Sequence, residues 1–162
     1  MVDVDKLTRD TLAKGGILAM LYFDMHGSSK EVLQELASGF VQKLLSEPGV
    51  VYALGEIDEP IQAKDEKFFS TSVEVKLLTT GFFQIFRICT AYSPFSLEIL
   101  KPNEVKLSID RAHEILMDGA MTTFEYKKHI IEKMSNKEQL AAYKKTIDQK
   151  IALGKRLSDK KG

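Results

Sequence analysis

Polar side chains that could bind a ligand recur on one face of the strands that the sequence predicts. Asp24 and His26 are two residues apart, so an extended chain places both side chains on the same face. A carboxylate beside an imidazole can ligate a divalent metal, bind the amine of a small ligand, or do acid–base work where burial shifts a pKa. The candidate ligand-binding residues are Tyr22, Asp24, His26, Glu56, Asp58, Ser70, Ser72 and Glu98. Asp24 and His26 are also the candidate metal ligands, and the alternative without function is a solvated strand end with scattered charges.

The elements that must position these residues follow from the spacing of apolar side chains. Alternation predicts four strands, at 17–26, 50–58, 68–78 and 95–100. Helical spacing predicts a helix over 32–45, opened by a capping box of Ser28 and Glu31. It also predicts a second helix, which Thr80-Gly81 opens and Ser93-Pro94 ends. This second helix is apolar nearly all round and should be deeply buried, whereas 61–67 is charged and typical of a loop.

The order β-α-β-β-α-β predicts an α+β fold, the ferredoxin-like split β-α-β sandwich with an antiparallel sheet. Right-handed crossovers would give the strand order four, one, three, two, with both helices on one face. The end of the first strand then lies beside the starts of the third and fourth, and the end of the second lies beside the start of the third. We therefore expect the candidate residues to gather in one region of the face without helices.

The remainder of the chain is predicted to be helical. Asn103 would cap a helix that Gly119 ends, and Thr122 with Glu125 would open another. Either Ser135 with Glu138 or Asn136 with Gln139 would start the last helix. Because no linker interrupts the sequence, we expect a single domain over 1–162, with a core at 16–100 and a helical appendage at 103–158.

One face of the predicted sheet carries apolar side chains that no predicted helix of the core covers. They are Leu18, Met20, Tyr22, Tyr52 and Leu54. Water should not meet them as one patch, so either the C-terminal helices fold back over them or a second subunit packs there. We therefore expect a homo-oligomer.

Composition restricts the partners and the compartment. Lys plus Arg and Asp plus Glu both number 23, so no basic excess indicates nucleic acid binding. The single cysteine, Cys89, allows no internal disulfide, and the acidic N-terminus lacks the basic region of a signal peptide. The longest apolar run, 15–23, is too short to span a bilayer. These features predict a cytoplasmic protein that binds neither nucleic acid nor membranes.

Sequence motifs of catalysis are missing. The chain has no P-loop, no Gly-x-Gly-x-x-Gly, no His-Glu-x-x-His and no Gly-x-Ser-x-Gly, and it identifies no cofactor. Cys89 lies on an apolar helix and is expected to be a small buried hydrophobe.

The run Leu-Ser-Glu-Pro-Gly-Val-Val-Tyr-Ala at 45–53 resembles the helix-to-strand junction of small regulatory ferredoxin-like domains. The ACT family and the ligand-sensing domains of Lrp-type regulators have similar junctions. This resemblance implies small-metabolite sensing, often at subunit interfaces, and oligomerisation. The chain as a whole also resembles an uncharacterised archaeal protein family.

Three functions remain open. The first is a non-catalytic oligomeric module that binds a small ligand or a metal at the acidic end of the sheet. The second is a small metal-dependent enzyme that uses Asp24, His26 and a carboxylate. The third is a structural protein whose C-terminal helices dock a partner along Leu140, Tyr143, Ile147 and Ile151. We expect binding rather than catalysis, because no catalytic motif supports a reaction.

Overall fold

The computed structural model describes residues 1–64 and 67–160. The chain divides into two compact units, Met1–Leu116 and Met117–Gly162, and the boundary falls inside the helix α4 (Ile109–Met134). The first unit is α+β and contains a five-stranded antiparallel sheet. The second unit contains the rest of α4 and the helix α5 (Lys137–Asp159).

The sheet is built from four long strands and one short one. These are β1 (Ile17–Gly27), β2 (Val50–Ile57), β3 (Ile61–Gln62), β4 (Phe69–Thr79) and β5 (Ser96–Lys101). The order is β2-β4-β1-β5, with β3 paired to β4, and all four ladders are antiparallel. Read from β5, the long strands follow the order four, one, three, two that the sequence suggested. The strand β3 was not predicted, because its two residues are too few to show alternation; residues 65 and 66 of the predicted loop lie outside the described part.

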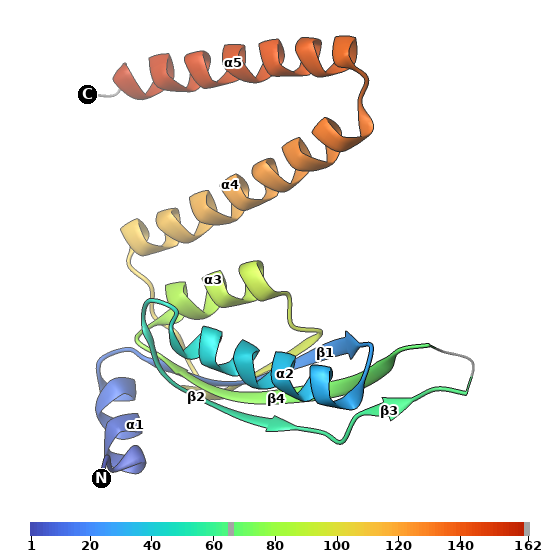
Figure 1. Ribbon diagram of the computed structural model, residues 1–162. Helices are drawn as coiled ribbons and strands as arrows, with labels where there is room; N and C mark the ends of the chain where they lie inside the picture. The colour runs from blue at the N-terminus through green and yellow to red at the C-terminus, as the bar shows by residue number, and fades with distance from the viewer. Residues whose placement is uncertain (65–66, 161–162) are drawn as a thin grey trace. The chain divides into compact units, whose positions relative to one another are not determined.

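Two helices, α2 (Lys30–Leu45) and α3 (Phe82–Tyr92), cover one face of this sheet (Figure 1). The pleat of β1 points Leu21 and Phe23 toward them, and both are buried. They pack in one core with Leu44 of α2 and Ile88 of α3. Burial of each such side chain stabilises the fold by roughly 1.5–3 kcal/mol.

The helix α2 begins one residue later than predicted. Its N-cap is Ser29, which is extended at φ −145° and accepts a hydrogen bond from the Val32 amide at 3.2 Å, so the predicted capping box at Ser28 is wrong. The reason is that β1 continues through Gly27, which leaves Ser28 in the turn. Glu31 still takes part in the cap: a hydrogen bond from its backbone amide and one from the Ser29 hydroxyl lower its pKa.

The helix α3 is less buried than predicted. Only Ile85 and Ile88 are buried, and its other apolar side chains are partly exposed. A helix on a sheet can bury only the stripe that faces the strands. The guanidinium groups of Arg87 and Arg111 lie 5.9 and 5.7 Å from the centre of the Phe83 ring, so cations shield that ring instead.

A helix that the sequence analysis missed, α1 (Val4–Ala13), packs on the opposite face of the sheet. Asp3 caps it by accepting a hydrogen bond from the Lys6 amide at 3.0 Å. The Thr8 hydroxyl lies 3.1 Å from the Tyr52 hydroxyl, which ties α1 to β2. The helix α1 therefore covers one end of the sheet face that lies opposite α2 and α3. Leu18 at this end is only 6% exposed. Farther along this face, Leu54 remains 52% exposed.

The predicted break at Gly119 is wrong, because α4 runs through it as one 26-residue helix. An interior glycine costs only about 1 kcal/mol relative to alanine, which a long helix tolerates. The helix begins at Ile109 rather than after Asn103. At this start the Ser108 hydroxyl accepts a hydrogen bond from the Arg111 amide at 3.2 Å.

The last helix, α5, begins with a capping box of Asn136 and Gln139, one of the two predicted starts. No helix in the described ranges is long and apolar enough to cross a membrane.

Candidate functional site

An open hollow of about 390 Å³ lies at the His26 end of the sheet, between β1, β4 and the turn from β2 to β3. We call it the strand-end hollow. Its lining residues are Asp24, His26, Asp58, Glu59, Ile61, Ser70, Thr71 and Ser72. Five of the eight predicted ligand-binding residues thus come together, in a volume typical of small-molecule sites, which is about 300–1,000 Å³.

Register explains why the polar residues of β1 and β4 converge. Asp24 lies directly opposite Ser72, and His26 lies directly opposite Ser70. Side chains directly opposite in an antiparallel pair share a face and lie within contact distance. The Ser72 hydroxyl donates to Asp24 Oδ1 at 3.2 Å, and His26 Nδ1 lies 3.0 Å from the Ser70 hydroxyl oxygen. Asp24 and His26 are therefore each oriented by a serine on β4.

The acidic turn after β2 supplies the third side of the hollow. The Asp58 amide donates to the Ser72 carbonyl at 3.0 Å, and the Thr71 hydroxyl donates to the Asp58 carbonyl at 2.6 Å. Because Thr71 is only 5% exposed, these bonds fix the backbone of the turn and hold the Asp58 side chain at the rim. Glu59 forms an ion pair with Lys30 at 3.6 Å, in which both side chains are exposed, so the pair adds about 1 kcal/mol at most.

The charge around the strand-end hollow is negative. Asp24, Asp58 and Glu59 bring three carboxylates, and among the described residues Lys30 is the one cation paired with them. Such a field attracts cations. Among residues 1–64 and 67–160, however, no group of three His, Cys, Asp or Glu residues lies close enough to hold a metal ion. Within this part of the chain, the predicted metal pair Asp24 and His26 therefore lacks the third ligand that a protein metal site normally has.

The other three predicted residues lie elsewhere on the sheet. Tyr22 is opposite Ser96, and its ring packs against Phe95 with the ring centres 6.2 Å apart. Glu98 lies opposite Met20 on the edge strand β5. Glu56 lines a second hollow of about 390 Å³, the sheet-face hollow, formed by Met20, Leu54, Gly55, Glu56, Glu74 and Lys76. The prediction grouped residues by face, but two residues along a strand already separate side chains by about 7 Å.

The strand-end hollow also contains residues that the sequence analysis did not propose. The sequence predicts a strand break at Glu59 and Pro60. Ile61 reaches the hollow because it pairs with Ser70 through β3. A two-residue strand leaves no periodic signal. Thr71 belongs to the core-facing side of β4 and borders the hollow near its hydrogen bond to the turn.

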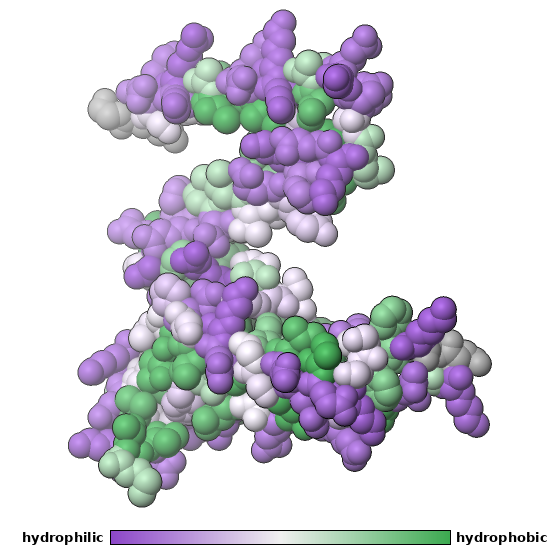
Figure 2. All heavy atoms as spheres, viewed as in Figure 1, coloured by the Kyte–Doolittle hydropathy of each residue, from purple (hydrophilic) through white to green (hydrophobic). Residues whose placement is uncertain are grey.

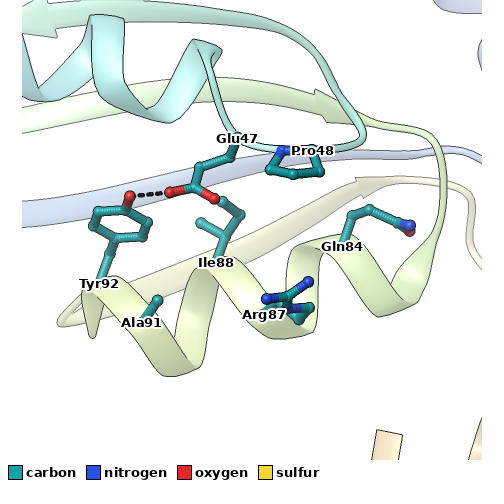
Figure 3. A pocket seen from close by; sticks show the side chains of 7 residues that line it. All are labelled: Glu47, Pro48, Gln84, Arg87, Ile88, Ala91 and Tyr92. Carbon is teal, nitrogen blue, oxygen red and sulfur yellow. Dashed lines mark hydrogen bonds between the residues drawn. The ribbon is translucent and has the colours of Figure 1, made fainter. Parts of the chain in front are cut away.

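A third hollow, of about 50 Å³, lies between the turn before β2 and α3 (Figure 3). There the Tyr92 hydroxyl donates a hydrogen bond to the Glu47 carboxylate. Burial, together with this bond and the charge of Glu47, raises the pKa of Tyr92 to about 12. A space of this size holds water rather than a metabolite, so the contact is structural.

Burial also raises the pKa of the Cys89 thiol, which disfavours the nucleophilic thiolate.

A model of the MJ0538 family matches residues 18–152, which is more than half of the chain. The chain belongs to the MJ0538 family. This is an archaeal family, and the match extends from β1 into α5, so both units carry MJ0538-family sequence. No curated protein and no solved structure gave a match. The similarity of 45–53 to ACT and Lrp-type junctions stays a prediction, since the matching model is of neither family.

Proposed function

We propose that this MJ0538-family chain is a non-catalytic binding module whose strand-end hollow takes a small ligand carrying a protonated amine. The observation that carries the proposal is the convergence of three carboxylates with hydroxyl groups and an imidazole on one hollow of about 390 Å³. An amine suits this lining better than a metal ion does, because the acidic side chains do not cluster within coordination distance of one point. The proposed scaffold is a ferredoxin-like core, supported by the order of the long strands and by α2 and α3 sharing one face.

The carboxylates differ in how much of their bonding capacity is left for a ligand. Asp24 uses one oxygen to accept from Ser72, and Glu59 pairs with Lys30. No hydrogen bond or ion pair engages the Asp58 carboxylate in the part of the chain that is described. An ammonium group donates three hydrogen bonds, so Asp24 and Asp58 are the acceptors proposed for it. His26 and Ser70 are the proposed partners for a second polar group of the ligand.

A hydrolytic reaction has weaker support at this site. Ser70 and His26 are within hydrogen-bonding distance, as a nucleophile and a base must be. A catalytic histidine is normally oriented by a third group on its other ring nitrogen. Within the described ranges no carboxylate bonds to Nε2 of His26. His26 is also exposed, so water competes for it.

A thermal-shift titration with a panel of small primary amines tests the proposal. A ligand at about one hundred times its Kd should add about 2.7 kcal/mol to the free energy of unfolding. That corresponds to a rise in Tm of roughly 5–10 °C for a chain of this size. Neutral compounds of the same size without the amine, and the chlorides of Mg²⁺, Mn²⁺ and Zn²⁺, form the comparison series.

The matched variants are Asp24→Asn and Asp58→Asn, which keep the shape and remove the charge. Each should weaken amine binding about tenfold or more, as expected for the loss of a charge-assisted hydrogen bond. Glu98→Gln removes a carboxylate from the same sheet outside the hollow and should leave binding unchanged. Equal shifts with the neutral compounds, or no shift with any amine, would contradict the proposal. A shift with a metal ion alone would favour the metal-dependent enzyme instead.

A further inference from the structure

Within Met117–Gly162, the helices α4 and α5 leave an apolar groove of about 420 Å³ between them. We call it the hairpin groove. Its lining residues are Phe124, Lys127, Ile130, Ile131, Tyr143, Thr146, Ile147 and Lys150. In Figure 2, hydrophobic (green) spheres gather along α5 where it faces α4. Of the residues described in this unit, Ile147 is the one apolar side chain that is buried.

The hairpin exposes more apolar surface than a stable unit should. Met121, Ile151 and Leu157 are 51%, 49% and 57% exposed. Two helices of this length bury too little surface to be stable alone, since units below about 40–60 residues usually need a partner or a staple. An occupant of the hairpin groove would bury part of this apolar surface.

Charge indicates which surface the groove fits. Residues 117–162 contain eleven Lys and Arg against six Asp and Glu, whereas residues 1–116 contain twelve against seventeen. The groove follows this bias, because its two charged lining residues are Lys127 and Lys150. The sheet-face hollow, in contrast, is lined by more acidic than basic side chains.

The sheet-face hollow combines apolar surface with acidic edges. Met20 and the half-exposed Leu54 form its apolar part. Glu56 and Glu74 lie directly opposite each other across β2 and β4 and bring two carboxylates close together, with Lys76 as the one cation of the lining. Like charges held opposite each other are destabilising unless a cation joins them.

We propose that the hairpin groove of one copy docks on the sheet-face hollow of a second copy, with Lys127 and Lys150 meeting Glu56 and Glu74. Reciprocal docking gives a closed twofold dimer, in which each copy supplies both surfaces. Charge is the argument for this occupant, because the groove contributes two lysines and the hollow contributes two glutamates. This dimer goes beyond ligand binding and does not depend on it, since none of its residues lines the strand-end hollow.

Light scattering on the full-length chain over a range of concentrations tests the dimer. The wild-type protein should reach twice the 18.2 kDa of one chain. The pair of substitutions Lys127→Glu and Lys150→Glu, and separately the pair Glu56→Lys and Glu74→Lys, should each raise the dimer Kd about tenfold or more, because like charges then meet. All four substitutions together should return the Kd to within about threefold of wild type. Glu35→Lys, on the exposed side of α2, is the control for a change of charge alone, and far-UV circular dichroism checks that each variant is folded.

The charge swap decides between the possible occupants. A monomer at every concentration would overturn the proposal, whether the groove is empty or filled within its own chain. A dimer weakened by the lysine substitutions but not by the glutamate substitutions would mean that two hairpins pack on each other, and it would overturn the proposal as well. Failure of the fourfold variant to dimerise, although it is folded, would show that the two charge sets do not meet.

Discussion

The two units of the chain use apolar residues in different ways. In Met1–Leu116, strand alternation directs side chains into one core between the sheet, α2 and α3, and residues such as Leu77 are fully buried. In Met117–Gly162, the helices are as long as those of many stable domains, yet the described residues include a single buried apolar side chain, Ile147. Amphipathic helices thus form a core only where a second apolar surface of matching extent faces them.

Truncating one leucine in each unit should give the largest difference. Leu21 is fully buried in the central strand β1, so Leu21→Ala should lower the free energy of unfolding by about 2–5 kcal/mol. Leu153 of α5 is 56% exposed, and Leu153→Ala should change it by less than about 0.5 kcal/mol in the monomer. Urea denaturation at low protein concentration measures both. Similar losses for the two variants would refute the contrast.

The next largest change in the free energy of unfolding is expected at the contact between α1 and the sheet. A Cβ added at Gly16 would lie 2.7 Å from the Thr79 carbonyl oxygen and 2.8 Å from that of Thr11. Because both atoms belong to the backbone, Gly16→Ala should cost about 1–3 kcal/mol. Gly39 of α2 has nothing within 4 Å of its added Cβ, so Gly39→Ala is the control and should instead stabilise by about 0.5–1 kcal/mol. A neutral Gly16→Ala would mean that α1 does not pack tightly there.

The bond between Tyr92 and Glu47 predicts a pH dependence within the first unit. The folded-state pKa of about 12 lies above the value of 10.0 expected for an unfolded tyrosine, so the folded state keeps its proton longer. The stability from this bond should be complete below about pH 10 and should fall as the pH rises toward 12.

Tyr92→Phe should therefore cost about 1 kcal/mol at pH 8 and less at pH 11. Urea midpoints of the wild type and the variant, measured at both pH values, give the difference directly. A difference that grows with pH would contradict the assignment.

The smallest effect concerns the hairpin. Gly154 of α5 has open space around it, so Gly154→Ala should stabilise the helix by about 0.5–1 kcal/mol. If the hairpin melts separately from the sheet, the gain should appear as slower hydrogen exchange of the backbone amides in α5 and should leave exchange in β1 unchanged. Equal slowing in both elements would show that the two units unfold together.

Much of the fold was predictable because the apolar pattern is strong where the core is. The alternation in 17–26 and 68–78 predicted β1 and β4, and the helix before Pro48 was clear from its apolar stripe. The helix α1 was missed although its signals are present in the sequence: Asp3 is an N-cap residue, and Val4, Leu7 and Leu12 recur at helical spacing.

The sequence predicted the sheet face of the candidate residues but not their position along the strands. Asp24 and His26 could be placed on one face by spacing alone, and their serine partners follow from the register of β1 and β4. Position along the strands could not be read so finely, so Glu56 and Glu98 were grouped with a hollow they do not reach. Glu59 and Ile61 enter it through a turn whose shape is set by the hydrogen bonds of Asp58 and Thr71.

Hydrogen exchange of backbone amides in α5 and in β1, followed as the protein concentration is raised, distinguishes a hairpin that is stabilised by a second copy from one that is stable alone. If the sheet carries its own core and the hairpin obtains one from a second copy, exchange in β1 should be slow at every concentration. Exchange in α5 should slow progressively as dimers form, because binding stabilises only the state that binds. Protection of α5 that equals that of β1 at the lowest concentration, and does not change on raising it, would contradict the account.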